Sequence, residues 1–364
     1  MRAIELTTQQ EQQIERYIAA FKRYMASDTF HKDQADRRER VAFFQQQLPE
    51  RLEEFSEADV IRIVKQLWAS RMWGNKDYLA QKIIDDNGID SLREQLKALV
   101  LAEDPEAAYA RFLEAIKGLG PASTTEILTY LYPERCGIWN RQAREALRAL
   151  GITNYLNLKK YKLSASEYRT FNRLLKAIAG ELQRSDISDV DLLLVDFFLY
   201  EVAQRAKAAA EVEGATPVIV SEEVSDFDHD EVRDLLADIG ATLGFDADVE
   251  VQVAHGARVD VVWRARIANL GLVTYVFEVH RSGSMDSLIL NLQKARSAPS
   301  VQKVIAVSSK DQLDKIRREC DGLPEGFRRA LRFWDVSDVL QTSEHLQKAM
   351  ASIDALDLIE RSAW

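Results

Sequence analysis

GARVDVVW at residues 256–263 and VFEVH at residues 276–280 are two strand-like runs, each with one carboxylate among apolar neighbours. The two carboxylates are Asp260 and Glu278. A carboxylate buried in an apolar strand is costly unless it is paired, hydrogen-bonded or bound to a cation. Both runs therefore contain a residue that simple core packing does not explain.

The alternation of side chains along a strand predicts where these carboxylates point. If Val259 and Val261 face one side of a sheet, Asp260 faces the other. Glu278 and His280 are separated by a single residue, so they should share a face of the next strand.

Antiparallel pairing around a turn at residues 269–271 would place Asp260 and Glu278 side by side. Two carboxylates held together in a cleft bind Mg²⁺ or Mn²⁺, which can position a water molecule for in-line attack on a phosphodiester and screen the developing charge. The plainer alternative is a pair of solvent-facing carboxylates on edge strands. We therefore expect a metal-dependent site, with solvent exposure as the competing interpretation.

Helical and extended patterns alternate around these two strands. We expect helices at residues 228–243, 287–296, 311–320 and 337–358, and strands at 249–254, 258–264, 273–280, 301–307 and 331–336. A helix, a meander of three strands and then alternating helices and strands is the pattern of an α/β sandwich with a central mixed sheet.

From the helix at Glu231 to the strand near Trp334, this arrangement resembles the PD-(D/E)XK nuclease superfamily, whose sheet carries Asp on one strand and Glu-x-Lys on the next. The resemblance implies a restriction-endonuclease-like fold. It also implies that Asp260 and Glu278 bind the metal ion together with Glu231 of the first helix. The Lys position of the superfamily is occupied by His280.

His280 could orient or deprotonate the attacking water, because the ordinary pKa of histidine lies near neutral pH. It could equally mark a site that has lost its activity. The run NLQKA at residues 291–295 is similar to the helix that follows the third strand in this superfamily, so Gln293 or Lys294 could contact the metal shell or the scissile phosphate. The residues expected to act in catalysis are Asp260, Glu278, His280, Gln293 and Lys294.

The amino-terminal half has a different texture from the carboxy-terminal half. Its apolar residues recur every three or four positions throughout, which predicts helices, and its prolines fall where this periodicity breaks. The pattern changes after Gly214. We therefore expect an all-helical domain over residues 1–213 and the α/β domain over residues 214–364.

One helical segment, FLEAIKGLGPASTTEIL at residues 112–128, combines an apolar helix end, Gly-Leu-Gly and a new helix opened by Pro121. Such a turn exposes backbone N–H groups at a helix amino terminus, which suits a DNA phosphate. Its glycines permit a positive φ and close backbone approach. The segment resembles a helix-hairpin-helix motif near residues 112–130, and an ordinary turn between two helices is the alternative.

The next segment, YPERCGIWNRQAREAL at residues 132–147, continues a resemblance to the helix-hairpin-helix DNA glycosylase superfamily. Those enzymes place a catalytic Asp in the loop after the hairpin, and the matching position in this chain is Asn140, which cannot act as a carboxylate. The resemblance thus implies a fold kept for binding the DNA backbone. The residues expected to contact DNA are Lys117, Gly118, Gly120, Ser123, Thr124, Arg141 and Arg144.

The net charge of -10 at first argues against a nucleic-acid partner, because phosphate contacts need Lys and Arg. The acidic excess is local, however, since residues 201–250 carry 3 basic and 14 acidic side chains. A basic patch elsewhere stays compatible with DNA binding, and a solvated helix face is the alternative for the same charges. The candidate residues for this patch are Arg141, Arg144, Arg148, Lys159, Lys160 and Lys162.

The remaining composition points to a reducing compartment. Cys136 and Cys320 lie far apart and lack the spacing of metal ligands, and the amino terminus is polar. No apolar run approaches the length of a membrane span. We therefore expect a cytoplasmic protein.

Together these patterns predict a metal-dependent endodeoxyribonuclease that uses Mg²⁺ or Mn²⁺ on double-stranded DNA in restriction, defence or repair, with a homodimer as a candidate assembly. The alternative is a DNA-binding or interaction protein that keeps the nuclease fold without its chemistry. His280 at the Lys position and the acidic overall charge favour that alternative. A third hypothesis is an unusual base-processing enzyme, and Asn140 argues against it.

Overall fold

The computed structural model describes residues 4–70, 76–212, 227–267 and 271–354. They form two compact units, one within residues 4–212 and one within 227–354. The predicted boundary at residues 213–214 lies outside the described residues, as do residues 269 and 270 of the predicted turn. Among the described helices, none combines the length and the apolar character that crossing a membrane requires.

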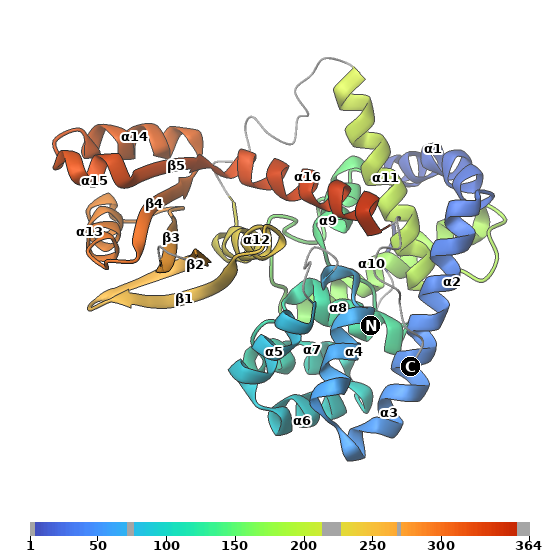
Figure 1. Ribbon diagram of the computed structural model, residues 1–364. Helices are drawn as coiled ribbons and strands as arrows, with labels where there is room; N and C mark the ends of the chain where they lie inside the picture. The colour runs from blue at the N-terminus through green and yellow to red at the C-terminus, as the bar shows by residue number, and fades with distance from the viewer. Residues whose placement is uncertain (1–3, 71–75, 213–226, 268–270, 355–364) are drawn as a thin grey trace. The chain divides into compact units, whose positions relative to one another are not determined.

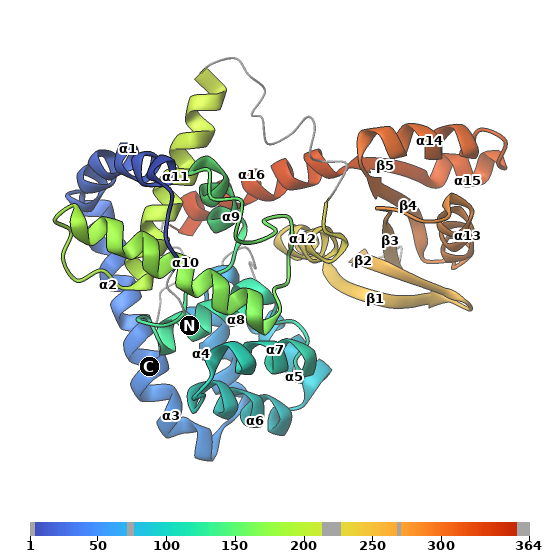
Figure 2. The ribbon, with the colours of Figure 1, turned by 180° about the vertical axis from the view of Figure 1, so that it is seen from behind.

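The first unit is helical, which confirms the prediction for the amino-terminal half (Figures 1 and 2). Its α-helices are α1 (Thr8–Met25), α2 (Asp28–Ala42), α3 (Leu48–Arg51), α4 (Glu57–Gln66), α5 (Lys76–Asn87), α6 (Ile89–Val100), α7 (Pro105–Ala115), α8 (Pro121–Leu131), α9 (Arg141–Ala149), α10 (Ala165–Arg184) and α11 (Leu192–Val212). Shorter helical turns are η1 (Phe43–Gln47), η2 (Leu52–Glu54) and η3 (Trp68–Ser70).

Local capping explains where several of these helices begin. The Thr7 hydroxyl accepts a hydrogen bond from the Gln10 N–H at 3.3 Å, and the Gln10 side chain accepts one from the Thr7 N–H at 3.0 Å. Pro105 and Pro121 stand at the first positions of α7 and α8, where the missing N–H has no helical partner to lose.

One buried carboxylate in the first unit accepts hydrogen bonds from two different helical segments. Glu126 on α8 is 2% exposed. It accepts hydrogen bonds from the N–H groups of Trp68 and Ala69 at 2.7 and 2.9 Å and from the Tyr130 hydroxyl at 2.9 Å. Burial raises the pKa of Glu126, while these three donors oppose the shift. The same bonds anchor η3 to α8.

The second unit is a mixed sheet with helices, as predicted for this half. Its elements are α12 (His229–Thr242), β1 (Asp246–Ala254), β2 (Ala257–Ile267), β3 (Gly271–Val279), α13 (Met285–Arg296), β4 (Val301–Ser308), α14 (Lys310–Cys320), α15 (Glu325–Ala330), β5 (Leu331–Asp335) and α16 (Val336–Asp354). The strand order is β1-β2-β3-β4-β5. The pairs β1–β2 and β2–β3 are antiparallel, and β3–β4 and β4–β5 are parallel.

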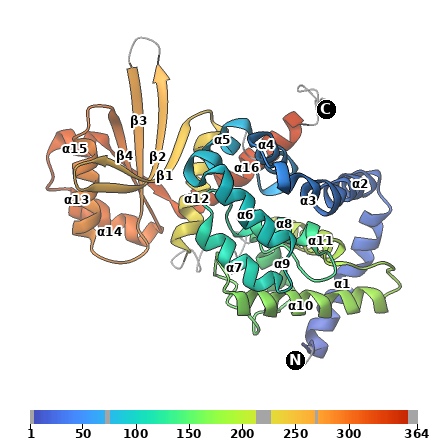
Figure 3. The same ribbon diagram turned by 90° about the horizontal axis from the view of Figure 1, so that it is seen from below.

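Helices cover both faces of this sheet (Figures 1 and 3). On one face, side chains of α13, α14 and α15 pack with sheet residues such as Val262 and Val276. On the other face, α12 and α16 pack with Trp263 and Phe277. Each strand of the hairpin β2–β3 therefore buries side chains on both sides, which explains its near-continuous apolar runs.

The predicted elements of the second unit are all present, with shifted bounds. The first three strands are longer than predicted, because cross-strand pairing continues beyond the apolar runs. Helix α15 was not expected, since its six residues are too few to show a helical period. Residues 355–358 of the predicted last helix lie outside the described residues.

Candidate functional site

The side chains of strand β2 do not alternate regularly between the two faces of the sheet at Asp260. Val259 packs against α13 on one face of the sheet, whereas Val261 packs on the opposite face. The condition under which Asp260 would face away from both valines is therefore not met, because the two valines lie on opposite faces. Glu250, at the register position of Asp260 on β1, has φ +53°, so the regular strand geometry is broken on both strands at this point.

At the end of the β2–β3 hairpin, the Asp260 carboxylate takes the place of a main-chain carbonyl as the hydrogen-bond acceptor for the Val279 N–H. The ladder between β2 and β3 ends at the pair Val261 and Phe277. Beyond it, Asp260 Oδ2 accepts a hydrogen bond from the Val279 N–H at 2.7 Å and lies 3.3 Å from His229 Nε2 on α12. Its charge also acts on the carboxyl group of Glu278 and raises the pKa of that group. The predicted proximity of the two carboxyl groups is thus present.

Glu278 is held from the other side by α13. Its side chain is 9% exposed, and Asn291 Nδ2 donates a hydrogen bond to its Oε1. The same amide nitrogen donates to the Arg258 carbonyl at 2.6 Å. Asn291 therefore links the carboxylate of β3 to the backbone of β2 and fixes its direction.

The two carboxyl groups differ in their affinity for a proton. Burial and the nearby charge of Asp260 raise the pKa of Glu278 from its ordinary value to about 9. Burial alone would also raise the pKa of Asp260, but hydrogen bonds from His229, Glu278 and the Val279 N–H lower it below its usual range. Near neutral pH the pair therefore shares one proton, and binding of a cation would displace it.

His229 is the side chain that α12 brings to this pair. Its ring lies 3.4 Å from Asp230 and 3.3 Å from Asp260, and hydrogen bonds to these two carboxylates raise its pKa to about 10. Glu231 was expected as a third metal ligand. Within the described part of the chain, no three His, Cys, Asp or Glu side chains group closely enough to hold a metal ion, so Glu231 does not complete the predicted set.

The donor atoms fit one kind of ion. Two adjacent carboxyl groups are hard oxygen ligands, and Mg²⁺ is commonly bound by one or two protein carboxylates while water or substrate phosphate completes its shell. Asp260 and Glu278 could hold such an ion. The described residues offer no soft thiolate ligand at this position, since Cys320 is buried in the core that the sheet forms with α13, α14 and α15.

A hollow of about 490 Å³ opens beside Glu278. His280, which is 7% exposed, lines it together with Glu278, as their predicted shared face requires. Lys294 also lines it, whereas Gln293 does not. Burial lowers the pKa of His280, so its imidazole is neutral at neutral pH. The lining residues are Gly256, Glu278, Val279, His280, Ser282, Ser284, Ser287, Leu288, Leu290, Asn291 and Lys294.

The first unit contains the predicted hairpin segment as α7, a turn and α8. Gly118 has φ +82°, and a Cβ atom there would lie 2.9 Å from Ile83 Cγ1. Asn87 clamps the preceding peptide, because its Oδ1 accepts from the Lys117 N–H at 2.8 Å and its Nδ2 donates to the Lys117 carbonyl at 3.0 Å. Gly120 is the N-cap of α8. Asn87 thus holds the backbone of the turn at Lys117, while the Lys117 side chain stays exposed.

Two of the side chains expected to contact DNA are buried. Thr124 is inaccessible, and its hydroxyl donates to the carbonyl of Gly120 at 3.0 Å. Arg144 is 5% exposed, and its guanidinium donates to the Lys160 carbonyl at 3.3 Å. Both side chains thus make internal contacts in this structure, whereas Lys117 and Gly118 are exposed and Ser123 is half-buried.

The predicted basic patch is largely used to hold a loop. Arg148 donates to the Leu158 carbonyl at 2.7 Å, next to the bond from Arg144 to the same loop. Arg141 pairs with Glu145 at 2.7 Å, and Lys160 pairs with Glu167 at 2.5 Å. Arg144, Arg148 and Lys160 thus fix the segment between α9 and α10, whereas the Arg141–Glu145 pair lies within α9 and Lys159 and Lys162 are exposed.

Asn140 begins α9. Its side chain accepts a hydrogen bond from the Ala143 N–H at 2.8 Å, which makes it the helix N-cap. The position that resembles the catalytic Asp of helix-hairpin-helix glycosylases thus carries a neutral amide at the start of a helix.

The helical unit is similar in sequence to a known family. The sequence pattern of the family described as "Putative 8-oxoguanine DNA glycosylase OGG-like protein" matches residues 9–196. The chain belongs to this OGG-like family. The matched region runs from α1 into α11, so it covers the first unit, and the sheet unit lies outside it. No curated protein and no solved structure matches the chain.

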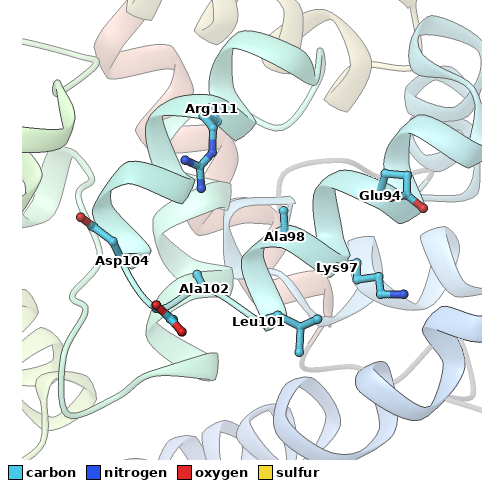
Figure 4. Close-up of a pocket in the computed structure, with 8 residues that line it drawn as sticks. Glu94, Lys97, Ala98, Leu101, Ala102, Asp104 and Arg111 are labelled. Atoms are coloured by element: carbon cyan, nitrogen blue, oxygen red, sulfur yellow. The ribbon is translucent and has the colours of Figure 1, made fainter.

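A second hollow, of about 500 Å³, lies in the OGG-like unit between α6 and α7 (Figure 4). Lys97 and Arg111 line it, but Figure 4 shows their side chains at separate places on its wall rather than converging. Leu101, which is 67% exposed, lines it as well. This arrangement of lining side chains does not indicate a particular reaction.

Sequence reasoning missed His229 and Asn291. A signal for His229 existed, because it stands three residues before Val232 and seven before Leu236, in phase with the buried face of α12. Asn291 likewise follows the buried Leu288 by three residues on α13. In both cases a polar residue extends an apolar stripe, which is the pattern that places it against the sheet.

Proposed function

We propose that the chain is a metal-dependent DNA nuclease whose OGG-like unit binds the duplex backbone and whose sheet unit cleaves phosphodiester bonds. The observation that carries the proposal is the proximity of Asp260 and Glu278 at the end of the β2–β3 hairpin, where Asp260 accepts from the Val279 N–H and its charge raises the pKa of Glu278. A PD-(D/E)XK fold for this unit is part of the proposal. The mixed sheet with helices on both faces supports it.

A Mg²⁺ or Mn²⁺ ion on these carboxylates would supply positive charge to the transition state and lower the pKa of a bound water. The chain's own residues would set the rest of the geometry. Asn291 orients Glu278 through its hydrogen bond to Oε1. His280, neutral and lining the same hollow, can accept a proton from the attacking water.

DNA is proposed as the substrate because of the family. Its description names a glycosylase that acts on DNA, and the turn before α8 exposes Lys117 and Gly118 beside a helix amino terminus. Removal of a base is not proposed, because Asn140 is a neutral cap and Glu126 is engaged by three donors in the core.

Cleavage of DNA by the purified chain tests the proposal. Plasmid and duplex DNA in unmodified, methylated and branched forms should be cut with Mg²⁺ or Mn²⁺ and left intact with EDTA. Asp260→Asn and Glu278→Gln should each lower the rate by at least about 100-fold. The matched control Asp311→Asn changes an exposed carboxylate at the start of α14 and should cut like the parent. Equal cutting by all four proteins would overturn the assignment.

The DNA contact of the OGG-like unit needs its own comparison. Lys117→Ala should weaken duplex binding by a few-fold without changing stability, because this side chain is exposed. Arg144→Ala should lower stability instead, because its guanidinium is buried against the α9–α10 loop. Equal DNA affinity of the parent and Lys117→Ala would remove the hairpin from the proposal.

A second function has a specific observation in its favour. His229 pairs with Asp260, so this carboxylate already has a protein partner. The described residues also contain no group of three metal ligands. A binding protein that keeps a degenerate nuclease fold would show both features. In that case Asp260→Asn would lose stability and no metal would support cutting. The homodimer remains a prediction, and sedimentation velocity of the full chain would test it.

A further inference from the structure

Glu250 lies on β1 where the regular alternation of the strand is broken. Ala247 and Val251 stand four positions apart, which regular alternation would place on one face, yet they pack on opposite faces of the sheet. Glu250 between them has φ +53°, a conformation that glycine and asparagine adopt more readily than glutamate. The glutamate therefore costs backbone free energy that its side-chain contacts must offset.

The Glu250 carboxylate accepts hydrogen bonds from two arginines that belong to different elements. Its Oε1 lies 3.0 Å from Arg233 Nη1 of α12, and its Oε2 lies 2.5 Å from Arg258 Nη2 of β2. Arg233 also pairs with Asp230 and Asp234 of its own helix, so its guanidinium is held in place. Glu250 thus connects α12 to β2 through one carboxylate on β1.

The arginine of α12 is linked to the carboxylate of Asp260. Arg233 stands four residues after His229, and residues four apart lie on the same side of a helix. His229 Nε2 lies 3.3 Å from Asp260 Oδ2. A contact that holds Arg233 against β1 therefore also holds His229 beside Asp260.

The arginine of β2 is linked to the carboxylate of Glu278. The backbone carbonyl of Arg258 accepts a hydrogen bond from Asn291 Nδ2 at 2.6 Å, and the same nitrogen donates to Glu278 Oε1. Arg258 is therefore held at its backbone by α13 and at its side chain by Glu250. Because Arg258 stands two residues before Asp260, these two contacts fix the course of β2 just before that carboxylate.

We propose that Glu250 is a positioning residue for the Asp260–Glu278 pair. Its carboxylate, bound between the two arginines, holds the break in β1 and β2 that lets Asp260 accept from the Val279 N–H. Glu250 does not line the hollow beside Glu278, so it acts through the backbone of β2 and through α12. The inference rests on the proposed function only in taking the pair as a metal site.

Replacement of Glu250 by glycine separates the role of the carboxylate from that of the backbone conformation. Glycine adopts φ +53° without strain, and ion pairs of a carboxylate that is 49% exposed contribute little to stability. Glu250→Gly should therefore melt like the parent. In the metal-free full chain, its Val279 N–H should exchange with deuterium at least about 10-fold faster than in the parent, because the acceptor Asp260 is displaced. The Val276 N–H, within the regular β2–β3 ladder, should exchange at the parent rate.

Asp248→Asn is the matched control for this comparison. It breaks another ion pair between β1 and β2, that of Asp248 with Arg264 at 2.5 Å, and should leave the Val279 rate unchanged. Equal Val279 rates in the parent and Glu250→Gly, a comparable acceleration in the control, or the same acceleration at Val276 would each overturn the proposal.

Arg258→Gln tests the same contact from its other side. The Arg258 side chain is 69% exposed, so this variant should fold even if Glu250→Gly does not. It should also accelerate Val279 exchange. In the Glu250→Gly background it should add less than about twofold, because the contact is already absent. Effects of the two substitutions that multiply would overturn the proposal.

Titration with Mn²⁺ separates this inference from the nuclease proposal. Glu250→Gly should bind Mn²⁺ at least about 10-fold more weakly than the parent, as expected when the support of a metal ligand is removed. Faster Val279 exchange in a chain that neither binds Mn²⁺ nor cuts DNA would support the positioning role and overturn the nuclease proposal. Metal-dependent cutting by the parent and Glu250→Gly alike, with equal exchange rates, would keep the nuclease proposal and overturn the positioning role.

Discussion

The carboxyl groups of Asp260 and Glu278 lie close enough at the end of the β2–β3 hairpin for the charge of Asp260 to raise the pKa of Glu278. This proximity exists because Asp260 leaves the regular alternation of β2 and takes the Val279 N–H as its partner at 2.7 Å. Two carboxyl groups so placed require a proton or a cation between them. The stability of the sheet unit and its affinity for metal ions should both depend on that requirement.

The first prediction concerns stability against pH in the absence of metal. The folded chain keeps a proton on Glu278, whose pKa is about 9, while the unfolded chain releases it near the ordinary value of glutamate. The contribution of this proton to the free energy of unfolding is therefore fully present at acid pH and is lost as pH rises toward about 9.

The side chain of Glu278→Gln is neutral at every pH, so this variant does not lose this contribution to stability as pH rises. Its stability relative to the parent should increase steadily between about pH 5 and pH 9 in urea unfolding experiments with EDTA. A difference between the two proteins that does not change with pH would show that Glu278 ionises normally in the folded chain.

The second prediction separates two residues of α13. Asn291→Ala removes the donor to Glu278 Oε1 and to the Arg258 carbonyl, so metal-dependent cutting should fall by about 10-fold or more. Gln293→Ala should stay within about twofold of the parent, because Gln293 does not line the hollow. The rates of both variants at saturating metal give the comparison, and the reverse order of effects would contradict this site.

The third prediction concerns the hairpin glycine. Gly118→Ala places a Cβ 2.9 Å from Ile83 Cγ1 at φ +82°, whereas Gly88→Ala meets the same kind of backbone, at φ +76°, with no neighbour within 4 Å. Both should lose about 1 kcal/mol for the left-handed conformation. Gly118→Ala should lose about 1–3 kcal/mol more for overpacking, as measured by urea unfolding. Equal losses would mean that Ile83 moves aside freely.

The fourth prediction concerns Asn140. Asn140→Ala should cost about 1 kcal/mol of stability, because it removes the cap on the Ala143 N–H, and Asn140→Asp should stay within about 0.5 kcal/mol of the parent. The parent should release no base from a duplex containing 8-oxoguanine. Base release by the parent would contradict a purely structural, helix-capping role for Asn140.

The order of strands and helices in the sheet unit could be predicted because apolar periodicity reports which residues are buried. The pairing of Asp260 with Glu278 followed from a hairpin between neighbouring strands. The facing of Val259 and Val261 could not be predicted, since it depends on the break opposite Glu250, and Glu250 carries no sequence signal for a positive φ.

The partners of the carboxylates were harder to predict than the carboxylates themselves. Which side chain of α12 reaches Asp260 depends on the rotation of that helix, and His229 rather than Glu231 is in phase with Val232. In the OGG-like unit, charge alone suggested that Arg144 faces DNA, but its position on the inner side of α9 depends on a long-range bond to the Lys160 carbonyl. Sequence patterns do not encode such tertiary bonds locally.

The most direct test of the central claim is a calorimetric titration of Mn²⁺ into the metal-free chain. The parent should bind one ion at the Asp260–Glu278 pair and release a proton on binding, because Glu278 is protonated beforehand. Asp260→Asn and Glu278→Gln should lose that binding. Mn²⁺ binding of the same affinity in both variants, or none in the parent, would contradict the claim that these two carboxylates form a metal site.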